Sequence, residues 1–513
     1  MTHQHLVRLD HPLQIHDIVA VANSTAHLDF DSATRDRIQA CRNTLEQSMK
    51  RPEPIYGVNT GFGSLSKQRI SNDQLGDLQI NLLRSHAAGI GDPLPIPVVR
   101  AMMALLAASL ARAVSGVRPV VIDQIIKLLD AQITPVVPSV GSVGASGDLA
   151  PLAHLALVLC GEGRAYLNNS IVDGAEALKQ SGIERISLQA KEGLALINGT
   201  HLMAARAALL CNRLQRLTDA AVIANAMAID SCKATDSFLD SRVYVARNQP
   251  GPALVAELLT SVLDGSGIIT SHETNDSRVQ DPYSFRCSPA VLGAAIDTLG
   301  YVRDVVKREI NAVTDNPLVF DNGDIVSAGN FHGMPIAIPL DMISVAVSHI
   351  AGISERRTFW TLAAREAEME LPAYLSASPG LHSGLMIAQY TAAACCNEII
   401  GLANPASVAN ISTSAGIEDY NSFGPRAAAK ADRAVELAER VIAIEMLCSL
   451  EGIRRHRPLR SGTGVEQAVE LLNSVIPPYD ADRSPSPDIE AIASMIRDGT
   501  FAEALPKSAF PID

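Results

Sequence analysis

The chain has 513 residues, of which 47% are hydrophobic and 19% charged, and its formal net charge is −13. This balance excludes a disordered protein, which needs low hydrophobicity and high charge, and an acidic chain gains no counterion-release affinity for nucleic acid. The eight scattered cysteines form no CxxC pair, which is typical of reduced thiols in a cytoplasmic protein.

The beginning of the sequence has no basic stretch followed by an apolar run, so it does not predict a signal peptide. The longest apolar run covers residues 101–111 and is too short to cross a bilayer. We therefore expect a cytoplasmic protein with neither a membrane nor nucleic acid as a partner.

Helical periodicity dominates the chain, in segments rich in alanine and leucine. The predicted helices, in order, cover residues 98–114, 122–129, 202–230, 291–313, 342–363, 383–402 and 427–450. Within 202–230 the apolar positions recur at spacings of four and three, which places them on one helical face. Several segments carry few charges and are apolar nearly all round, as in the interior of a large bundle or at a subunit contact. We therefore expect long central helices and a homo-oligomer.

Strand-like pieces are confined to the N-terminal third. Segment 165–172 has an Asn-Asn pair between β-forming residues and predicts a hairpin. We predict a mainly α fold with a mixed α/β region over residues 1–196, a long central helix bundle over 197–480 and a C-terminal helical segment over 481–513.

A glycine-rich segment, PSVGSVGASGDLAPLAH, covers residues 138–154. Its G-x-x-G-x-x-G spacing fits neither a dinucleotide fold nor a P-loop, and a glycine directly after Ser146 rules out a nucleophile elbow. A plain helix entry capped by Asp148 remains one interpretation. The alternative is chemical: in Ala145-Ser146-Gly147 the small neighbours let the Gly147 nitrogen reach the Ala145 carbonyl carbon. Cyclisation with loss of two waters would give an imidazolone ring with a methylidene group derived from Ser146.

Further motifs agree with that chemistry. They are, in order, YGVNTGFG (56–63), LALINGT (194–200), QDPYSFRC (280–287), SAGNFHG (327–333) and EDYNSFG (418–424). HAAGIG (86–91) and NAVTDNPL (311–318) belong to the same set. Together with the Ala-Ser-Gly tripeptide, this ordered set resembles the aromatic amino-acid ammonia-lyases, which include histidine, phenylalanine and tyrosine ammonia-lyases and related aminomutases.

The resemblance implies the ammonia-lyase/fumarase-like helical fold and a 4-methylidene-imidazol-5-one (MIO) formed from Ala145, Ser146 and Gly147. This ring would be the only cofactor, with no external cofactor and no metal, and would accept the substrate amine. Tyr56 matches the base that takes the β-proton, and Tyr283 would be a second phenol for proton handling.

The resemblance also assigns groups that hold the substrate. Arg286 suits the carboxylate, because a guanidinium offers a planar anion two donors. Asn198 and Gln280 would donate amide hydrogen bonds to the carboxylate and the ring oxygen, and Phe331 would pack beside the electrophile.

The implied assembly is a homotetramer with active sites shared between subunits. Loop 56–66 and the segment carrying Arg286 and Phe331 would then come from different chains.

Two positions indicate the substrate. His86, after Ser85, and Glu418 match histidine-specific members, and a histidine with a carboxylate can bond both imidazole nitrogens. A phenyl ring would leave that buried carboxylate unpaired. We therefore expect conversion of L-histidine to trans-urocanate.

Four departures from histidine-specific members concern the pocket and its surroundings; they are Ile417, Met334, His201 and Tyr420. A tyrosine or phenylalanine ammonia-lyase, or an aminomutase, therefore remains an alternative.

Two other enzyme classes are alternatives. A serine hydrolase would use Ser146 with Asp148 and either His154 or His86, but would leave the flanking Ala and Gly unexplained. A metal enzyme is suggested by histidines near the start of the chain, namely His3, His5, His11 and His16. They have no carboxylate at helical ligand spacing, and HETND (272–276) is not HExxH. Solvated histidines are the favoured interpretation.

Overall fold

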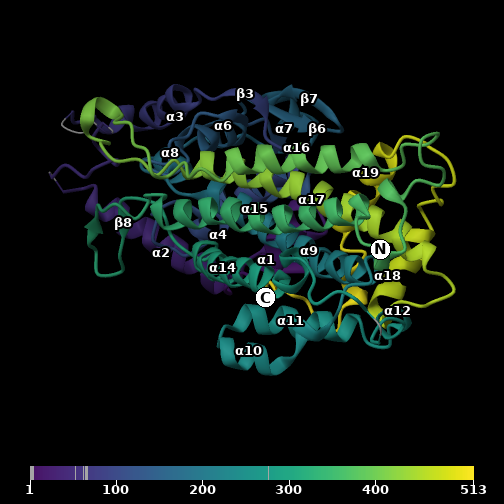
Figure 1. Cartoon of the computed structure of the whole chain (residues 1–513). Coiled ribbons are helices and arrows are strands. Elements are labelled where there is room, and N and C mark those ends of the chain that lie inside the picture. Colours follow the sequence, from purple (N-terminus) through teal and green to yellow (C-terminus); the bar gives the residue numbers. More distant parts are fainter. Residues whose placement is uncertain (1–4, 52, 62, 64–67, 275) are drawn as a thin grey trace.

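The computed structural model describes residues 5–51, 53–61, 63, 68–274 and 276–513. Helices dominate, and Figure 1 shows the long ones running side by side, with part of the N-terminal region and its short strands along one flank. The predicted mainly α fold is confirmed, whereas the boundaries at residues 196 and 480 stay predictions.

The N-terminal mixed region combines helices with short strands. Its helices are α1 (Ile15–Ala22), α2 (Ser32–Ser48), α3 (Leu75–His86), α4 (Ile96–Ala111), α5 (Pro119–Asp130), α6 (Leu149–Leu159), α7 (Gly174–Gln180) and α8 (Glu192–Ile197). Its strands are β1 (His5–Arg8), β2 (Ala26–Asp29), β3 (Ile90–Pro93), β4 (Thr134–Pro135), β5 (Pro138–Val140), β6 (Arg164–Leu167) and β7 (Ser170–Asp173). β1 and β2 pair in parallel, β3 pairs with β5, and β6 lies between β4 and β7.

The hairpin predicted over 165–172 is present as β6 and β7. Arg164 pairs with Asp173 and Leu167 with Ser170. Both turn residues, Asn168 and Asn169, have positive φ, the conformation that a two-residue hairpin turn with this strand twist requires.

The central bundle consists of α9 (His201–Ser231), α14 (Ser288–Glu309), α15 (Met334–Ala363), α16 (Met386–Leu402) and α17 (Gly424–Arg455). α17 packs against α9, α15 and α16, and α15 also packs against α14. Every predicted helix is found. α15 begins at Met334, before the predicted start at residue 342. The prediction placed the start too late because Pro335 and Pro339 lie inside the first turns of α15, and proline usually breaks helices.

Shorter elements connect and cap the bundle. They are β8 (Leu318–Val319), β9 (Ile325–Val326), α10 (Ser241–Arg247), α11 (Pro250–Val262), α12 (Gly267–Thr270), α13 (Tyr283–Arg286), α18 (Thr463–Asn473) and α19 (Ser486–Asp498). Single 3₁₀ turns lie at Asn72–Gln74, Ser237–Leu239, Ala367–Met369, Ala373–Leu375, Ser414–Gly416 and Ala502–Ala504. α10 and α11 project from the bundle on the side opposite α3 and α6 (Figure 1).

The core joins the mixed region to the bundle. In α4 every residue from Val98 to Ala111 is buried, and α4 packs against α9. Each fully buried Leu or Ile contributes about 1.5–3 kcal/mol, so these helices hold the loops between them in fixed positions.

α15 is also long and apolar enough to cross a membrane, although 61% of its most apolar window is buried inside the protein. The sequence had suggested no such stretch. Core helices meet the same criterion, and the packing of α15 against the other four bundle helices, α9, α14, α16 and α17, indicates a core helix.

Candidate active site

A cavity of about 940 Å³ opens where loops of the mixed region meet the N-terminal ends of bundle helices. Six of the predicted site residues line it: Tyr56, His86, Ser146, Asn198, Phe331 and Glu418. Apolar side chains form much of the remaining wall, including Leu82, Leu149, Leu194, Ile197 and Ile417. The cavity is therefore mostly apolar with a few polar groups, as small-molecule sites usually are.

The glycine-rich loop reaches this cavity through Ser146. Gly147 has φ +73° and pairs with Gly199, which lies two residues before α9 begins at His201. A Cβ on Gly147 would lie 2.1 Å from the Gly199 carbonyl oxygen. Both the positive φ and this contact require glycine at position 147, which keeps the backbone of the tripeptide close to the helix end.

Asp148 holds the loop against α9. Its carboxylate is fully buried and accepts hydrogen bonds from Ser142 Oγ (3.1 Å), Leu202 N (2.9 Å) and Met203 N (3.1 Å). Burial raises the pKa of Asp148 to about 7, although these donors lower it. The side chain does not cap α6, the helix that follows it. The helix-cap interpretation is therefore wrong, because the N–H groups of α9 take this carboxylate instead.

His86 and Glu418 are the two ring-reading candidates. His86 Nδ1 lies 2.9 Å from the Leu82 carbonyl oxygen, so that nitrogen donates and Nε2 is left as an acceptor. Burial lowers the pKa of His86, partly offset by the Leu82 carbonyl and the charge of Glu418. Glu418 accepts from Ser146 Oγ at 3.4 Å and from Thr413 Oγ1 at 3.0 Å.

Tyr56 and Asn198 line the same cavity. The Tyr56 hydroxyl accepts a hydrogen bond from Gly63 N at 3.3 Å. Asn198 Nδ2 donates to the Asn316 carbonyl at 3.1 Å, whereas its buried Oδ1 has no partner within the described chain. The free atom of Asn198 is thus an acceptor, which suits a donor on the substrate better than a carboxylate.

The other predicted residues lie outside the cavity. Tyr283 and Arg286 are on α13, where the guanidinium stacks on the phenol at 4.5 Å and donates to the Asp281 carbonyl at 3.0 Å. Gln280 is exposed just before α13. A single chain therefore does not bring these three residues to Ser146.

The position of Phe331 differs from what was expected. Phe331 and loop 56–66 were expected to reach one site from different chains. Phe331 lines the same cavity as Tyr56 within one chain. The reason is that the loop before α15 folds back beside Asn316 and Ser327, whose side chains are hydrogen bonded at 3.2 Å. In loop 56–66, residues 62 and 64–67 lie outside the described residues.

Of the four departures, Ile417 alone belongs to the described cavity wall. His201 is buried beside Gly199. Both its ring nitrogens lack partners among the described groups, and burial lowers its pKa to about 4. Tyr420 stacks on His332 with ring centroids 6.5 Å apart, and Met334 begins α15. The other three departures therefore lie outside the described cavity wall: His201 is buried, whereas Tyr420 is 65% exposed.

Several polar residues of the cavity wall were not singled out from the sequence, and Asn316 makes the most informative contacts among them. Asn316 lines the cavity, receives Asn198 Nδ2 on its carbonyl, and accepts from Ala328 N at 2.7 Å on its side chain. It lies within NAVTDNPL, so the motif contained the signal without indicating which residue reaches the cavity.

The hydrolase interpretation finds no support in the geometry. The hydrogen bond described for Ser146 Oγ goes to Glu418, and His154 Nε2 accepts from Gly89 N at 3.1 Å, away from the cavity wall. No described hydrogen bond joins Ser146 to either histidine, so the serine is not activated as a nucleophile.

Comparison with known proteins agrees with the motifs. Residues 13–474 match the model of the aromatic amino acid lyase family. A histidine ammonia-lyase of Anaeromyxobacter sp. (strain K) is 44% identical over 95% of this chain and 97% of its own length. A histidine ammonia-lyase of Gloeobacter violaceus is 43% identical over 98% of this chain and 97% of its own length.

Solved structures confirm the predicted fold. The crystal structure of histidine ammonia-lyase from Trypanosoma cruzi has a TM-score of 0.90 at 36% identity, covering 98% of this chain and 94% of its own. A tyrosine aminomutase from Streptomyces globisporus has a TM-score of 0.91 at 31% identity, covering 97% of this chain and 98% of its own. The chain therefore belongs to the aromatic amino acid lyase family and is a carbon–nitrogen lyase.

Proposed function

We propose that this enzyme eliminates ammonia from L-histidine to give trans-urocanate, with an MIO formed from Ala145, Ser146 and Gly147. The observation that carries the substrate assignment is that His86 and Glu418 line one cavity with Ser146. The two histidine ammonia-lyases described above, similar over nearly the whole chain, support it.

The tripeptide fits an MIO on structural grounds. Ala145 and Gly147 are buried, and the absent Cβ of Gly147 leaves just the space that Gly199 fills. Asp148 fixes the C-terminal side of the tripeptide on α9. The ring supplies an electrophilic methylidene carbon for the substrate amine, a reagent that no side chain offers.

His86 and Glu418 hold the substrate ring. Because His86 Nδ1 donates to Leu82, both His86 Nε2 and the Glu418 carboxylate face the cavity as acceptors. Two acceptors match an imidazole with both nitrogens protonated, and the positive charge of that ring makes the neighbouring β-proton more acidic. A phenyl side chain has no donor for either group and would leave the carboxylate facing the cavity without a substrate partner.

Tyr56 takes the β-proton, in line with its place in the cavity. Gly63 N donates to its hydroxyl oxygen, and such a donor stabilises negative charge on that atom. Asn198 Oδ1, buried and unpartnered, accepts a hydrogen bond from the substrate and so orients it.

The substrate carboxylate needs a cation that one chain does not provide. No Lys or Arg appears among the described residues of the cavity wall. Arg286 is displayed on α13 beside apolar side chains that lack cover: Val279 is 97% exposed and Tyr283 70% exposed. We therefore propose a homotetramer in which Arg286, Tyr283 and Gln280 of a neighbouring copy complete each site.

The free cysteine thiols support a cytoplasmic location. All eight cysteines are free, as is usual in a reducing compartment.

The substrate assignment is tested by incubating the purified enzyme separately with L-histidine, L-tyrosine and L-phenylalanine. Urocanate absorbance and released ammonia are expected from histidine. Coumarate or cinnamate would contradict the substrate assignment, and a β-amino acid without free ammonia would indicate an aminomutase.

Glu418→Gln should lower kcat/KM for L-histidine by about 10–100-fold, because a hydrogen bond to a charged group contributes about 1.5–3 kcal/mol. Turnover of L-phenylalanine should not fall, since a phenyl ring donates no hydrogen bond to this carboxylate. Glu176→Gln, the same change on the exposed surface of α7, is the control. An equal loss with both substrates would show that Glu418 does not read the ring.

Shared sites predict complementation between two defective chains. Arg286→Gln should lower kcat/KM about 100-fold or more, because a buried anion loses its charged partner. Co-expressed Ser146→Ala and Arg286→Gln chains, purified as mixed oligomers through two different tags, should regain activity that neither chain has alone. Mixed oligomers that stay as inactive as the separate variants would contradict site sharing.

A further inference from the structure

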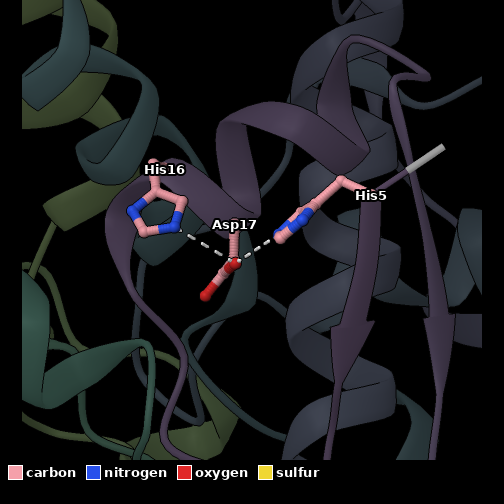
Figure 2. A group of neighbouring side chains, drawn as sticks. All are labelled: His5, His16 and Asp17. Carbon is pink, nitrogen blue, oxygen red and sulfur yellow. Dashed lines mark hydrogen bonds and ion pairs between the residues drawn. The ribbon is translucent and has the colours of Figure 1, made fainter. Parts of the chain in front are cut away.

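A group of ligand-type side chains lies near the start of the chain, outside the cavity wall described above. Figure 2 shows His5, on β1, and His16, at the start of α1, converging on Asp17 from two sides. His5 Nε2 lies 3.3 Å and His16 Nε2 3.5 Å from Asp17 Oδ1. One ligand atom from each residue lies within 4.8 Å of the others.

Neighbouring groups orient two of these side chains. His16 Nδ1 lies 2.8 Å from Asp513 Oδ2, so in the neutral ring Nδ1 carries the proton and Nε2 carries a lone pair. Gln14 N donates to Asp17 Oδ2 at 2.8 Å, which leaves Oδ1 facing the histidines. A ligating histidine whose other nitrogen donates to a carboxylate is the usual arrangement around protein-bound zinc.

The spacing of the ligand atoms fits a shared cation. Asp17 Oδ1 lies 3.3 Å from His5 Nε2 and 3.5 Å from His16 Nε2. Such contacts are made either by a protonated imidazole or by a cation held between the atoms, and zinc binding distinguishes the two. In a tetrahedral zinc site with bonds near 2.0–2.1 Å, neighbouring ligand atoms are about 3.3 Å apart, close to both separations found here.

We propose that His5 Nε2, His16 Nε2 and Asp17 Oδ1 bind one divalent transition-metal ion of the zinc class. Two imidazoles and one carboxylate suit zinc better than calcium or magnesium, which prefer oxygen ligands. The histidine side chains are 55% and 54% exposed, so an ion reaches them from solvent and water completes its coordination. From the sequence, solvated histidines were favoured; His3 lies outside the described residues.

The ion has a structural role. It joins β1 to α1 directly and reaches Asp513 through His16, whereas none of these residues lines the active-site cavity. Binding to the folded state alone stabilises that state in proportion to ion concentration. Zinc should therefore raise the thermal stability of the enzyme and leave its lyase activity unchanged.

The test uses tag-free, full-length enzyme stripped with a chelator and titrated calorimetrically with ZnCl₂. We expect one Zn²⁺ per chain that is absent in His16→Ala and in His5→Ala, and a zinc-dependent rise in Tm of roughly 2 °C. Asp513→Asn should bind about 10-fold more weakly, because partners of a ligating histidine commonly contribute 10–100-fold in affinity.

His11→Ala is the matched control, since His11 is an exposed histidine that contacts Asp10 instead of this cluster. It should bind zinc like the unaltered enzyme. Melting curves without zinc show whether each variant is folded. Equal zinc binding by the unaltered enzyme, His5→Ala and His16→Ala would overturn the proposal, as would the absence of any binding in the unaltered enzyme.

Discussion

Ser146→Ala should keep the full mass of its unmodified chain and should release urocanate from L-histidine slower by roughly four orders of magnitude or more. Alanine lacks the hydroxyl that leaves as water when the methylidene forms, and no other side chain of the cavity offers an electrophilic carbon. Intact-mass spectrometry and the absorbance assay measure the two effects separately. The unaltered enzyme should be lighter than its sequence by two water molecules.

Ser139→Ala is the matched control for this substitution. Ser139 lies on β5, seven residues before Ser146, and is exposed outside the cavity wall. This variant should lose two waters and retain activity. Urocanate formation by Ser146→Ala at the unaltered rate, or an unaltered enzyme whose mass equals its sequence, would show that the tripeptide does not form the ring.

Local pattern was sufficient to predict most of the fold. The alternating apolar spacings in 202–230 define one face of α9, and the Asn168-Asn169 pair defines the turn of the β6–β7 hairpin. The start of α15 was missed because proline normally marks the end of helical structure, whereas Pro339 here lies inside the helix. Burial among neighbouring helices compensates for the hydrogen bond lost at that proline.

The residues of the site were predicted from sequence motifs, but their arrangement in space was not. The sequence gives the types and order of Tyr56, Ser146 and Glu418, but only the fold shows that they line one cavity. It could not show that Phe331 joins this cavity within one chain. Nor could it show that Arg286 faces solvent beside Tyr283, because these placements depend on how loops from distant parts of the chain pack.

The convergence of His5, His16 and Asp17 also could not be predicted from the sequence. His16 and Asp17 are adjacent in sequence, a spacing at which helical side chains do not normally face each other. They converge because Asp17 turns back to accept from Gln14 N at the helix start, and β1 brings His5 to the same carboxylate.

Tyr56→Phe should retain the mass of the ring-containing enzyme and lose about 1,000-fold in kcat, because a positioned base contributes typically 10²–10⁴-fold. The substitution removes one oxygen from the cavity and leaves the phenyl ring in place. Its cost in stability is small, since Gly63 N loses a single hydrogen bond, worth about 1 kcal/mol. KM for L-histidine should change little, because His86 and Glu418 hold the substrate ring.

Tyr166→Phe removes the same atom from β6, outside the described cavity wall, and should leave kcat unchanged. The mass measurement separates two causes of inactivity: an inactive Tyr56→Phe enzyme with the ring has lost its base, whereas one without the ring has a misfolded loop. Retention of kcat by Tyr56→Phe would assign β-proton removal to another group. Tyr283 of a neighbouring copy would then be the phenol to test, and its contribution would depend on the assembly that the complementation experiment probes.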